Sequence, residues 1–183
     1  VPSYVFPKLV QTLPEDYIAK LNDVNYLSAV LIILELYQPF SKHYWLNIAD
    51  RSIPFVGLIE QTNLVSPSIY DNKHVLYISN YLDESNPLFN MTDAELLEVY
   101  IPHLKAINPS FDKSWIHKWH YHKVAAAQPI IEPMYSKRIP THHTPIKNRY
   151  LANTTQIYPE DRGTNYSVRL GRQVAKTAIQ NFE

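Results

Sequence analysis

The residues best suited to chemistry lie near the carboxy terminus, in the run Arg162-Gly163-Thr164-Asn165-Tyr166. The pattern predicts a strand over Tyr150-Leu151-Ala152, an irregular turn that begins at Asn153, and a helix that starts just after Gly163. The first N–H groups of a helix have no intrahelical partner, and the helix dipole adds partial positive charge at that end. This layout favours an anionic or electron-rich ligand group beside residues 162–166. An amphipathic helix that only packs on the sheet is the alternative.

Histidines offer a second kind of chemistry, because His117, His120 and His122 are close in sequence and His142-His143 follow. On a strand, His120 and His122 share one face and His117 points to the other. A metal would therefore need the second histidine pair to fold back, and no acidic ligand is adjacent. We expect packing or surface roles for these residues and no metal site. Without cysteine or a Gly-x-Ser-x-Gly elbow, the chain has neither a thiol nucleophile nor a hydrolase signature.

Aromatic side chains are the third signal, since Tyr44, Trp45, Tyr77 and Trp119 fall on expected strands. They are candidates for lining an apolar pocket for a small-molecule substrate. Aromatic residues are also good strand formers, so ordinary sheet packing is the favoured interpretation for any single one of them.

Composition narrows the function classes. The 17 basic and 17 acidic side chains cancel, which leaves no overall field for nucleic acid. No apolar run reaches the length of a membrane span and no signal peptide opens the chain, so we expect a cytoplasmic protein. Three glycines cannot build G-x-G-x-x-G or a P-loop, so the main pyrophosphate site of any bound nucleotide must lie elsewhere.

The order of the expected elements predicts an α+β fold, with a mostly antiparallel mixed sheet and flanking helices. The chain ends in a strand-turn-helix. A capping box at Thr92-Asp93-Ala94-Glu95 opens a helix that Pro102 should bend or restart. The other expected elements are a helix over 14–21 and strands over 26–37, 44–48, 55–60, 74–79 and 115–123, with a hairpin between the second and third strands. A buried helix is the alternative for 26–37.

Two segments carry a resemblance to a known family. Ser167 through Ala175 resembles the Ala-Val-x-Ser-Gly-x-x-Ala-like run in the flavin-binding segment of the amine oxidase, protoporphyrinogen oxidase and phytoene desaturase superfamily. Ile157 through Tyr166 is similar to a segment of proteins described as NAD(P)/FAD-dependent oxidoreductases. The resemblance implies FAD as cofactor, with flavin contacts at Ala152, Asn153, Arg162, Gly163, Thr164, Asn165 and Tyr166. Asn153 stands where a Gly-Asp pair is usual, and Tyr166 replaces a glycine.

The resemblance also implies an organisation: an exit strand and linker over 1–12, a substrate-binding domain over 13–140, and an FAD-contacting segment over 141–183. The chain begins with Val1, and we expect a fragment that lacks the amino-terminal dinucleotide-binding half. In the full-length protein the flavin would accept a hydride from an amine or carbon substrate. The fragment alone should be inactive, should not retain FAD, and should form a homo-oligomer through exposed apolar surface. No catalytic residue can be assigned. The alternative function is a non-catalytic interaction module that binds a partner through the aromatic sheet face.

Overall fold

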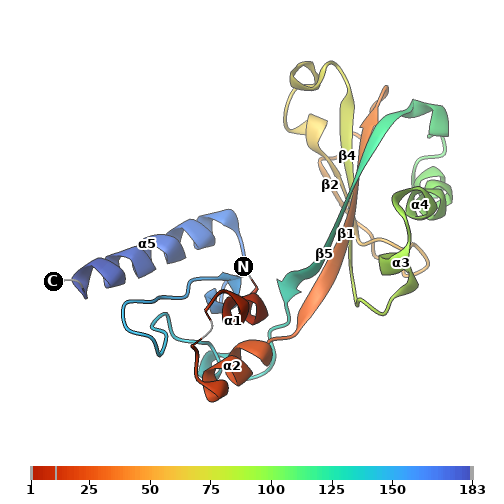
Figure 1. The fold of residues 1–183 in the computed structure, drawn as a ribbon. Helices are drawn as coiled ribbons and strands as arrows, with labels where there is room; N and C mark the ends of the chain where they lie inside the picture. The colour runs from red at the N-terminus through yellow and green to blue at the C-terminus, as the bar shows by residue number, and fades with distance from the viewer. Residues whose placement is uncertain (1, 11, 182–183) are drawn as a thin grey trace. The chain divides into compact units, whose positions relative to one another are not determined.

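The computed structural model describes residues 2–10 and 12–181, and the chain divides into two compact units (Figure 1). Leu27–Gln128 form one, here called the sheet unit. Val1–Tyr26 and Pro129–Glu183 form the other, here called the terminal unit. The predicted functional boundaries at residues 12 and 140 stay a prediction. Within the described ranges, no helix has both the length and the apolar character needed to cross a membrane.

The sheet unit is built on five strands in the order β2-β3-β4-β1-β5. The strands are β1 (Tyr26–Leu36), β2 (Trp45–Asn47), β3 (Gly57–Glu60), β4 (His74–Leu82) and β5 (Ile116–Pro129). The pairs β1–β4, β3–β4 and β2–β3 are antiparallel, which confirms the predicted hairpin. The strand β5 extends beyond the predicted end at Lys123. The Ser28 hydroxyl on β1 donates to the Ala125 carbonyl at 2.8 Å, so the alanine run stays beside β1.

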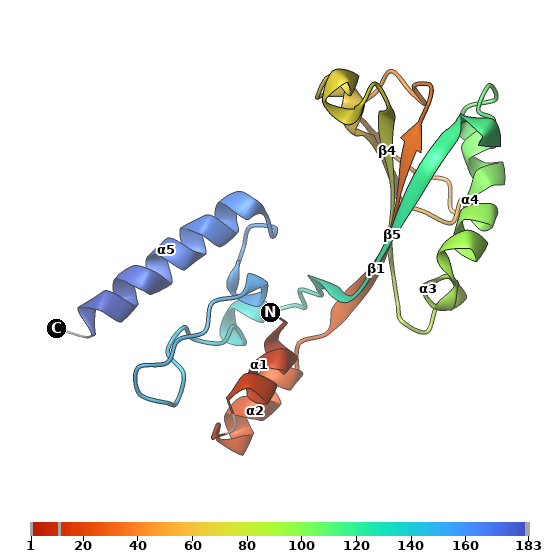
Figure 2. The same ribbon diagram turned by 45° about the horizontal axis from the view of Figure 1, so that its top comes forward.

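Helices α3 (Pro87–Asn90) and α4 (Asp93–Ile107) cover one face of this sheet, as both ribbon views show (Figures 1 and 2). Alternate β1 residues are buried on that face, as the period of two along a strand requires. Their neighbours in the core from α4 are Leu96, Leu97, Tyr100 and Leu104. The predicted capping box at Thr92 is present, and α4 continues through Pro102 without restarting.

The terminal unit contains α1 (Phe6–Leu9), α2 (Glu15–Asn22) and α5 (Thr164–Gln180), and the last two confirm predicted helices. Short 3-10 turns cover Ser3–Val5, Tyr135–Lys137 and Thr154–Gln156. Its apolar cluster is small and consists of Leu13, Tyr17, Leu21 and Leu151.

Two strand predictions in the terminal unit differ from the structure. The expected exit strand over 1–12 is helical at residues 3–9, and its residues 1 and 11 lie outside the described ranges. The expected strand at 150–152 is a single bridge between His143 and Tyr150. Asn153 ends the extended segment, because its side chain caps the 3-10 turn that follows.

Candidate functional site

A buried polar network joins Ser3 to the segment that follows Leu151. The Asn153 Oδ1 atom accepts hydrogen bonds from the Thr155 hydroxyl at 2.6 Å and the Thr155 N–H at 3.2 Å. Asn153 Nδ2 donates to Ser3 Oγ at 3.1 Å, and the Tyr135 hydroxyl donates to the Thr155 carbonyl at 2.7 Å. Buried polar groups are costly unless they are hydrogen-bonded, so each member of the network holds the others. Internal bonds therefore fix the Asn153 side chain, whereas its neighbour Ala152 is exposed.

An ion pair between Glu160 and Arg169 links the turn that precedes α5 to the helix. The Arg169 guanidinium donates to Glu160 Oε1 at 2.5 Å and lies 4.8 Å from the centre of the Tyr166 ring. The hydrogen bond from Arg169 lowers the pKa of the Glu160 carboxyl. Tyr166 therefore has a guanidinium against its ring.

The start of α5 has no side-chain cap. Gly163 is the N-cap residue, with an extended backbone (φ −161°, ψ 160°) that any residue adopts. A Cβ at Gly163 would lie 2.7 Å from Asn165 Oδ1, so the close approach there is to a side chain. Ser167 N–H donates to the Gly163 carbonyl at 2.9 Å, and the first turn holds no acidic residue. The N–H groups of Thr164, Asn165 and Tyr166 precede this bond and are suited to an external acceptor.

The face of the sheet opposite α4 carries a row of large side chains. The register places Trp45 opposite Ile59, Ile59 opposite Tyr77, and Tyr77 opposite Ile33. Directly paired residues share a face, so these four side chains cross β2, β3, β4 and β1 in one line. The next row contains Asn47, Gly57, Ser79 and Leu31. Trp45 is 55% exposed, and its indole N–H donates to Asn47 Oδ1 at 2.8 Å. We call these two rows the open face.

Trp119 does not lie with Trp45 and Tyr77. Its indole N–H donates to Asp93 Oδ2 at 3.0 Å, and Asp93 is the first residue of α4, on the covered side of the sheet. Tyr44 immediately precedes β2, and its ring centre lies 6.4 Å from that of Trp45. The structure thus brings together three of the four predicted pocket aromatics.

Two of the three histidines of β5, His117 and His120, have hydrogen-bond partners on β1 and just beyond it. His120 Nε2 lies 2.7 Å from Glu35 Oε1, and His117 Nδ1 lies 2.8 Å from the Tyr37 hydroxyl. The hydrogen bond with His120 lowers the pKa of the Glu35 carboxyl. In the part of the chain that the structure describes, no three His, Asp or Glu side chains gather as metal ligands would.

Sequence reasoning missed the buried polar residues Ser3, Thr155 and Gln156. A local signal existed for Gln156, because Asn153-x-x-Gln156 fits the capping-box pattern, and both reciprocal bonds are present. Ser3 offered no such signal, because its partner Asn153 is 150 residues away in sequence.

Comparison with known proteins gives a family and a fold. Residues 1–177 match the sequence model of the family described as flavin containing amine oxidoreductase. No curated protein sequence matches the chain. A protein of Exiguobacterium sp. 255-15, provisionally assigned as a protoporphyrinogen oxidase, is 14% identical with a TM-score of 0.73, and the match covers 98% of this chain and 40% of that one.

Two further solved structures are similar. An oxidoreductase from Methanosarcina mazei is 17% identical with a TM-score of 0.65, over 96% of this chain and 41% of that one. A reduced UDP-galactopyranose mutase is 13% identical with a TM-score of 0.57, over 68% of this chain and 27% of that one. These identities support likeness of fold alone, and the chain spans less than half the length of each of these three structures.

Proposed function

The chain belongs to the flavin containing amine oxidoreductase family, and from this premise we propose that it forms the substrate-binding lobe and flavin-contacting segment of an FAD-dependent oxidoreductase. FAD is the cofactor that the family implies for the full-length protein. When bound, the flavin supplies the capacity to accept a hydride from an amine or a carbon centre. The residues of this chain then have two tasks, which are to hold the ring and to place the substrate.

The uncapped start of α5 is the observation that carries the proposal. Three N–H groups and the positive helix end are suited to an electron-rich ring edge, and no acidic residue of the first turn competes. The ring would be held by the backbone of Gly163, Thr164, Asn165 and Tyr166, with Arg162 and Ala152 alongside. Asn153 would act indirectly, because its side chain is engaged with Ser3 and Thr155.

The residues present do not fit the pyrophosphate of FAD. The three glycines, Gly57, Gly163 and Gly171, are separated in sequence and form no phosphate loop. We therefore expect the chain by itself to retain no FAD and to turn over no substrate. A flavin absorbance band that co-elutes with the purified chain on gel filtration would contradict this expectation.

The open face is the proposed substrate wall. Trp45, Ile59, Tyr77 and Ile33 supply a broad apolar surface, and Tyr44 lies at its edge. Such a surface suits the apolar part of an amine or carbon substrate and excludes water from the reacting atom. The acid or base of the reaction is not assigned to this chain.

Two glycines of this chain give a matched test in the full-length protein. Gly163→Val puts a branched side chain beside the N–H groups proposed to hold the ring and displaces Asn165 Oδ1, whereas a Cβ at Gly171 meets nothing within 4 Å. We expect Gly163→Val to lose bound flavin or shift its reduction potential. Gly171→Ala and Arg172→Ala, on exposed positions of the same helix, should leave both unchanged.

Flavin content is read from absorbance per polypeptide, and the potential from dye-coupled titration. If Gly163→Val keeps the flavin content and potential of the Gly171→Ala protein, α5 is a packing helix and the flavin assignment fails.

A second experiment tests the substrate wall separately. A panel of primary, secondary and tertiary amines is mixed anaerobically with the full-length protein, and flavin bleaching is followed. Trp45→Ala and Tyr77→Ala should slow bleaching by any active amine while flavin content stays constant. Trp119→Phe is the control on the covered face. Equal slowing in all three variants would remove the open face from the substrate site.

Self-association is also part of the proposal. In the terminal unit, Leu9, Val168 and Ile179 are more than half exposed (65%, 51% and 63%). Apolar side chains at these positions favour assembly of the isolated chain into a dimer or larger species. Sedimentation velocity measures this directly, and a monomer at all concentrations would contradict it.

A further inference from the structure

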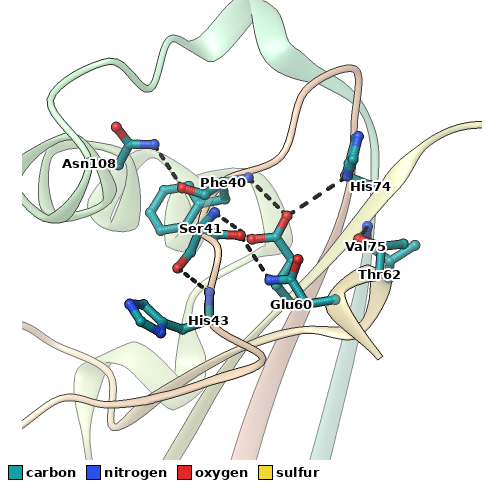
Figure 3. A network of polar contacts seen from close by, with 9 residues as sticks. Phe40, Ser41, His43, Glu60, Thr62, His74, Val75 and Asn108 are labelled. Atoms are coloured by element: carbon teal, nitrogen blue, oxygen red, sulfur yellow. Dashed lines mark hydrogen bonds and ion pairs between the residues drawn. The ribbon is translucent and has the colours of Figure 1, made fainter. Parts of the chain in front are cut away.

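Glu60, the last residue of β3, has a carboxylate that is almost fully buried, at 1% exposure (Figure 3). Its Oε1 atom accepts a hydrogen bond from the Phe40 N–H at 2.9 Å, and its Oε2 atom accepts one from the Ser41 N–H at 2.5 Å. Asn108 Nδ2 donates to the Phe40 carbonyl and Asn63 Nδ2 to the Ser41 carbonyl, both at 2.8 Å. Side chains therefore bind the N–H and carbonyl groups of both residues.

Glu60 also holds the other end of the same loop. Its own N–H donates to the Tyr44 carbonyl at 2.9 Å, and the preceding residue, Ile59, pairs with Trp45. One residue thus closes the loop from Phe40 to Tyr44 at both ends, through its side chain at one end and its backbone at the other. Immediately after this loop, Trp45 enters the open face.

The carboxylate has a specific advantage at this position. Two acceptor oxygens meet two converging N–H groups, and hydrogen bonds to an ionised acceptor are roughly twice as strong as neutral ones. Burial raises the pKa of Glu60, and the bonds from Ser41 and Phe40 oppose that rise. Among the described residues, His74 is the titratable group that faces it, with Nδ1 3.9 Å from Oε1. Burial lowers the pKa of His74, so the backbone N–H groups are the principal partners of the carboxylate.

We propose that Glu60 is a positioning residue, which fixes the loop from Phe40 to Tyr44 and thereby sets where the Trp45 side chain stands on the open face. The functional role of Glu60 rests on the substrate role proposed above for the open face. Glu60 touches neither substrate nor flavin in this proposal, and it acts through Trp45.

Fluorine NMR of protein labelled with 5-fluorotryptophan tests the proposal without any substrate. The chain has three tryptophans, Trp45, Trp115 and Trp119, so three resonances are expected, and Trp45→Phe assigns the first. Glu60→Gln keeps the side-chain size but replaces one acceptor by a donor, so one of the two N–H groups loses its partner. The Trp45 resonance should shift or broaden while that of Trp119, whose indole N–H donates to Asp93, stays in place. Trp115 is no reference, because its ring packs on Phe111 and Phe111 packs on Phe40.

Glu98→Gln is the matched control, since the Glu98 side chain is 61% exposed and pairs with Lys113 on the surface. It should leave the Trp45 and Trp119 resonances unchanged. Trp115 lies in the same 3-10 turn as Lys113, so its resonance is no reference for this control. Asn63→Ala removes an outer contact to Ser41 and should move the Trp45 resonance in the same direction by a smaller amount. This second variant keeps the test valid if Glu60→Gln does not fold.

An unchanged Trp45 resonance in folded Glu60→Gln, or in Asn63→Ala where Glu60→Gln does not fold, would overturn the proposal. Equal movement of the Trp45 and Trp119 resonances would also overturn it, because that result indicates general loosening. The outcome is separable from the proposed function. If Glu60→Gln moves Trp45 but Trp45→Ala leaves amine-dependent flavin bleaching unchanged, the positioning role stands and the substrate wall fails.

Discussion

Each of the two units has its own kind of interior. The sheet unit has one continuous core, in which alternate strand residues pack against α4. The terminal unit has an apolar cluster of four buried residues, and beside it lies the buried polar set Ser3, Asn153, Thr155 and Gln156. Apolar burial is spread over many contacts, whereas a polar network depends on each bond. Single polar substitutions should therefore matter more in the terminal unit.

One motif occurs in both units and makes the comparison sharp. Thr92 and Glu95 form a capping box at the exposed start of α4, and Asn153 and Gln156 form one at a buried 3-10 turn. The local hydrogen bonds are alike. The residues of the second box also bond to other segments of the chain. Asn153 Nδ2 donates to Ser3 Oγ, and Gln156 Nε2 donates to the Pro140 carbonyl at 3.0 Å.

The largest effect is expected from a cavity in the sheet unit. Leu34 is fully buried at 0% exposure, so Leu34→Ala should cost about 2–5 kcal/mol in the free energy of unfolding. Urea denaturation measures this cost. Leu31→Ala, on the open face of the same strand, is the control and should cost clearly less. Equal costs would mean that the open face is as tightly packed as the core.

A smaller loss is expected from Asn153→Ala in the terminal unit. The substitution removes the Oδ1 atom that accepts from both the N–H and the hydroxyl of buried Thr155, at a cost of about 1–3 kcal/mol. Hydrogen exchange should rise in the peptides containing residues 3 and 153–156. Thr154→Ala, at an exposed neighbouring position, is the control. If both variants melt at the wild-type temperature, the polar network does not stabilise this unit.

Removing the exposed capping box should cost less than removing the buried one. Thr92→Ala takes away one helix cap, worth typically about 1 kcal/mol. Glu95 N–H then bonds to water, because the start of α4 is exposed. A direct comparison of urea midpoints for Thr92→Ala and Asn153→Ala tests the ranking. The reverse order would show that burial adds nothing to this motif.

Sequence alone predicted the sheet unit better than the terminal unit, because more of its structure follows from local patterns. The alternation in β1 and the capping box of α4 are local patterns, and local patterns can be read without knowing the partner. The start of α5 after Gly163 was likewise predicted from local spacing. The bond from Asn153 to Ser3 and the burial of Glu60 depend on contacts between distant segments. Trp119 shows the remaining limit, because strand periodicity alone did not reveal which face of β5 meets α4.

The smallest effect is expected from the pH dependence of Glu60, where opposing influences partly cancel. Burial, the largest cause, raises the pKa of the folded-state carboxyl above its ordinary value of 4.5, and the Ser41 and Phe40 bonds lower it. Between these two values the native state binds more protons than the unfolded state, so stability falls as pH rises. The contribution is complete below pH 4.5 and is lost as pH rises through the folded-state pKa.

Glu60→Gln removes this titration and leaves the other carboxyls as they are. The unfolding free energy of the wild type, minus that of Glu60→Gln, should therefore increase as pH falls from about 8 toward 4.5. Urea unfolding at several pH values gives the difference, in which the remaining groups cancel. A difference that decreases instead would mean that the two backbone bonds outweigh burial. In that case Glu60 would resemble Asn153 of the terminal unit, whose buried side chain is held by hydrogen bonds with Ser3 and Thr155.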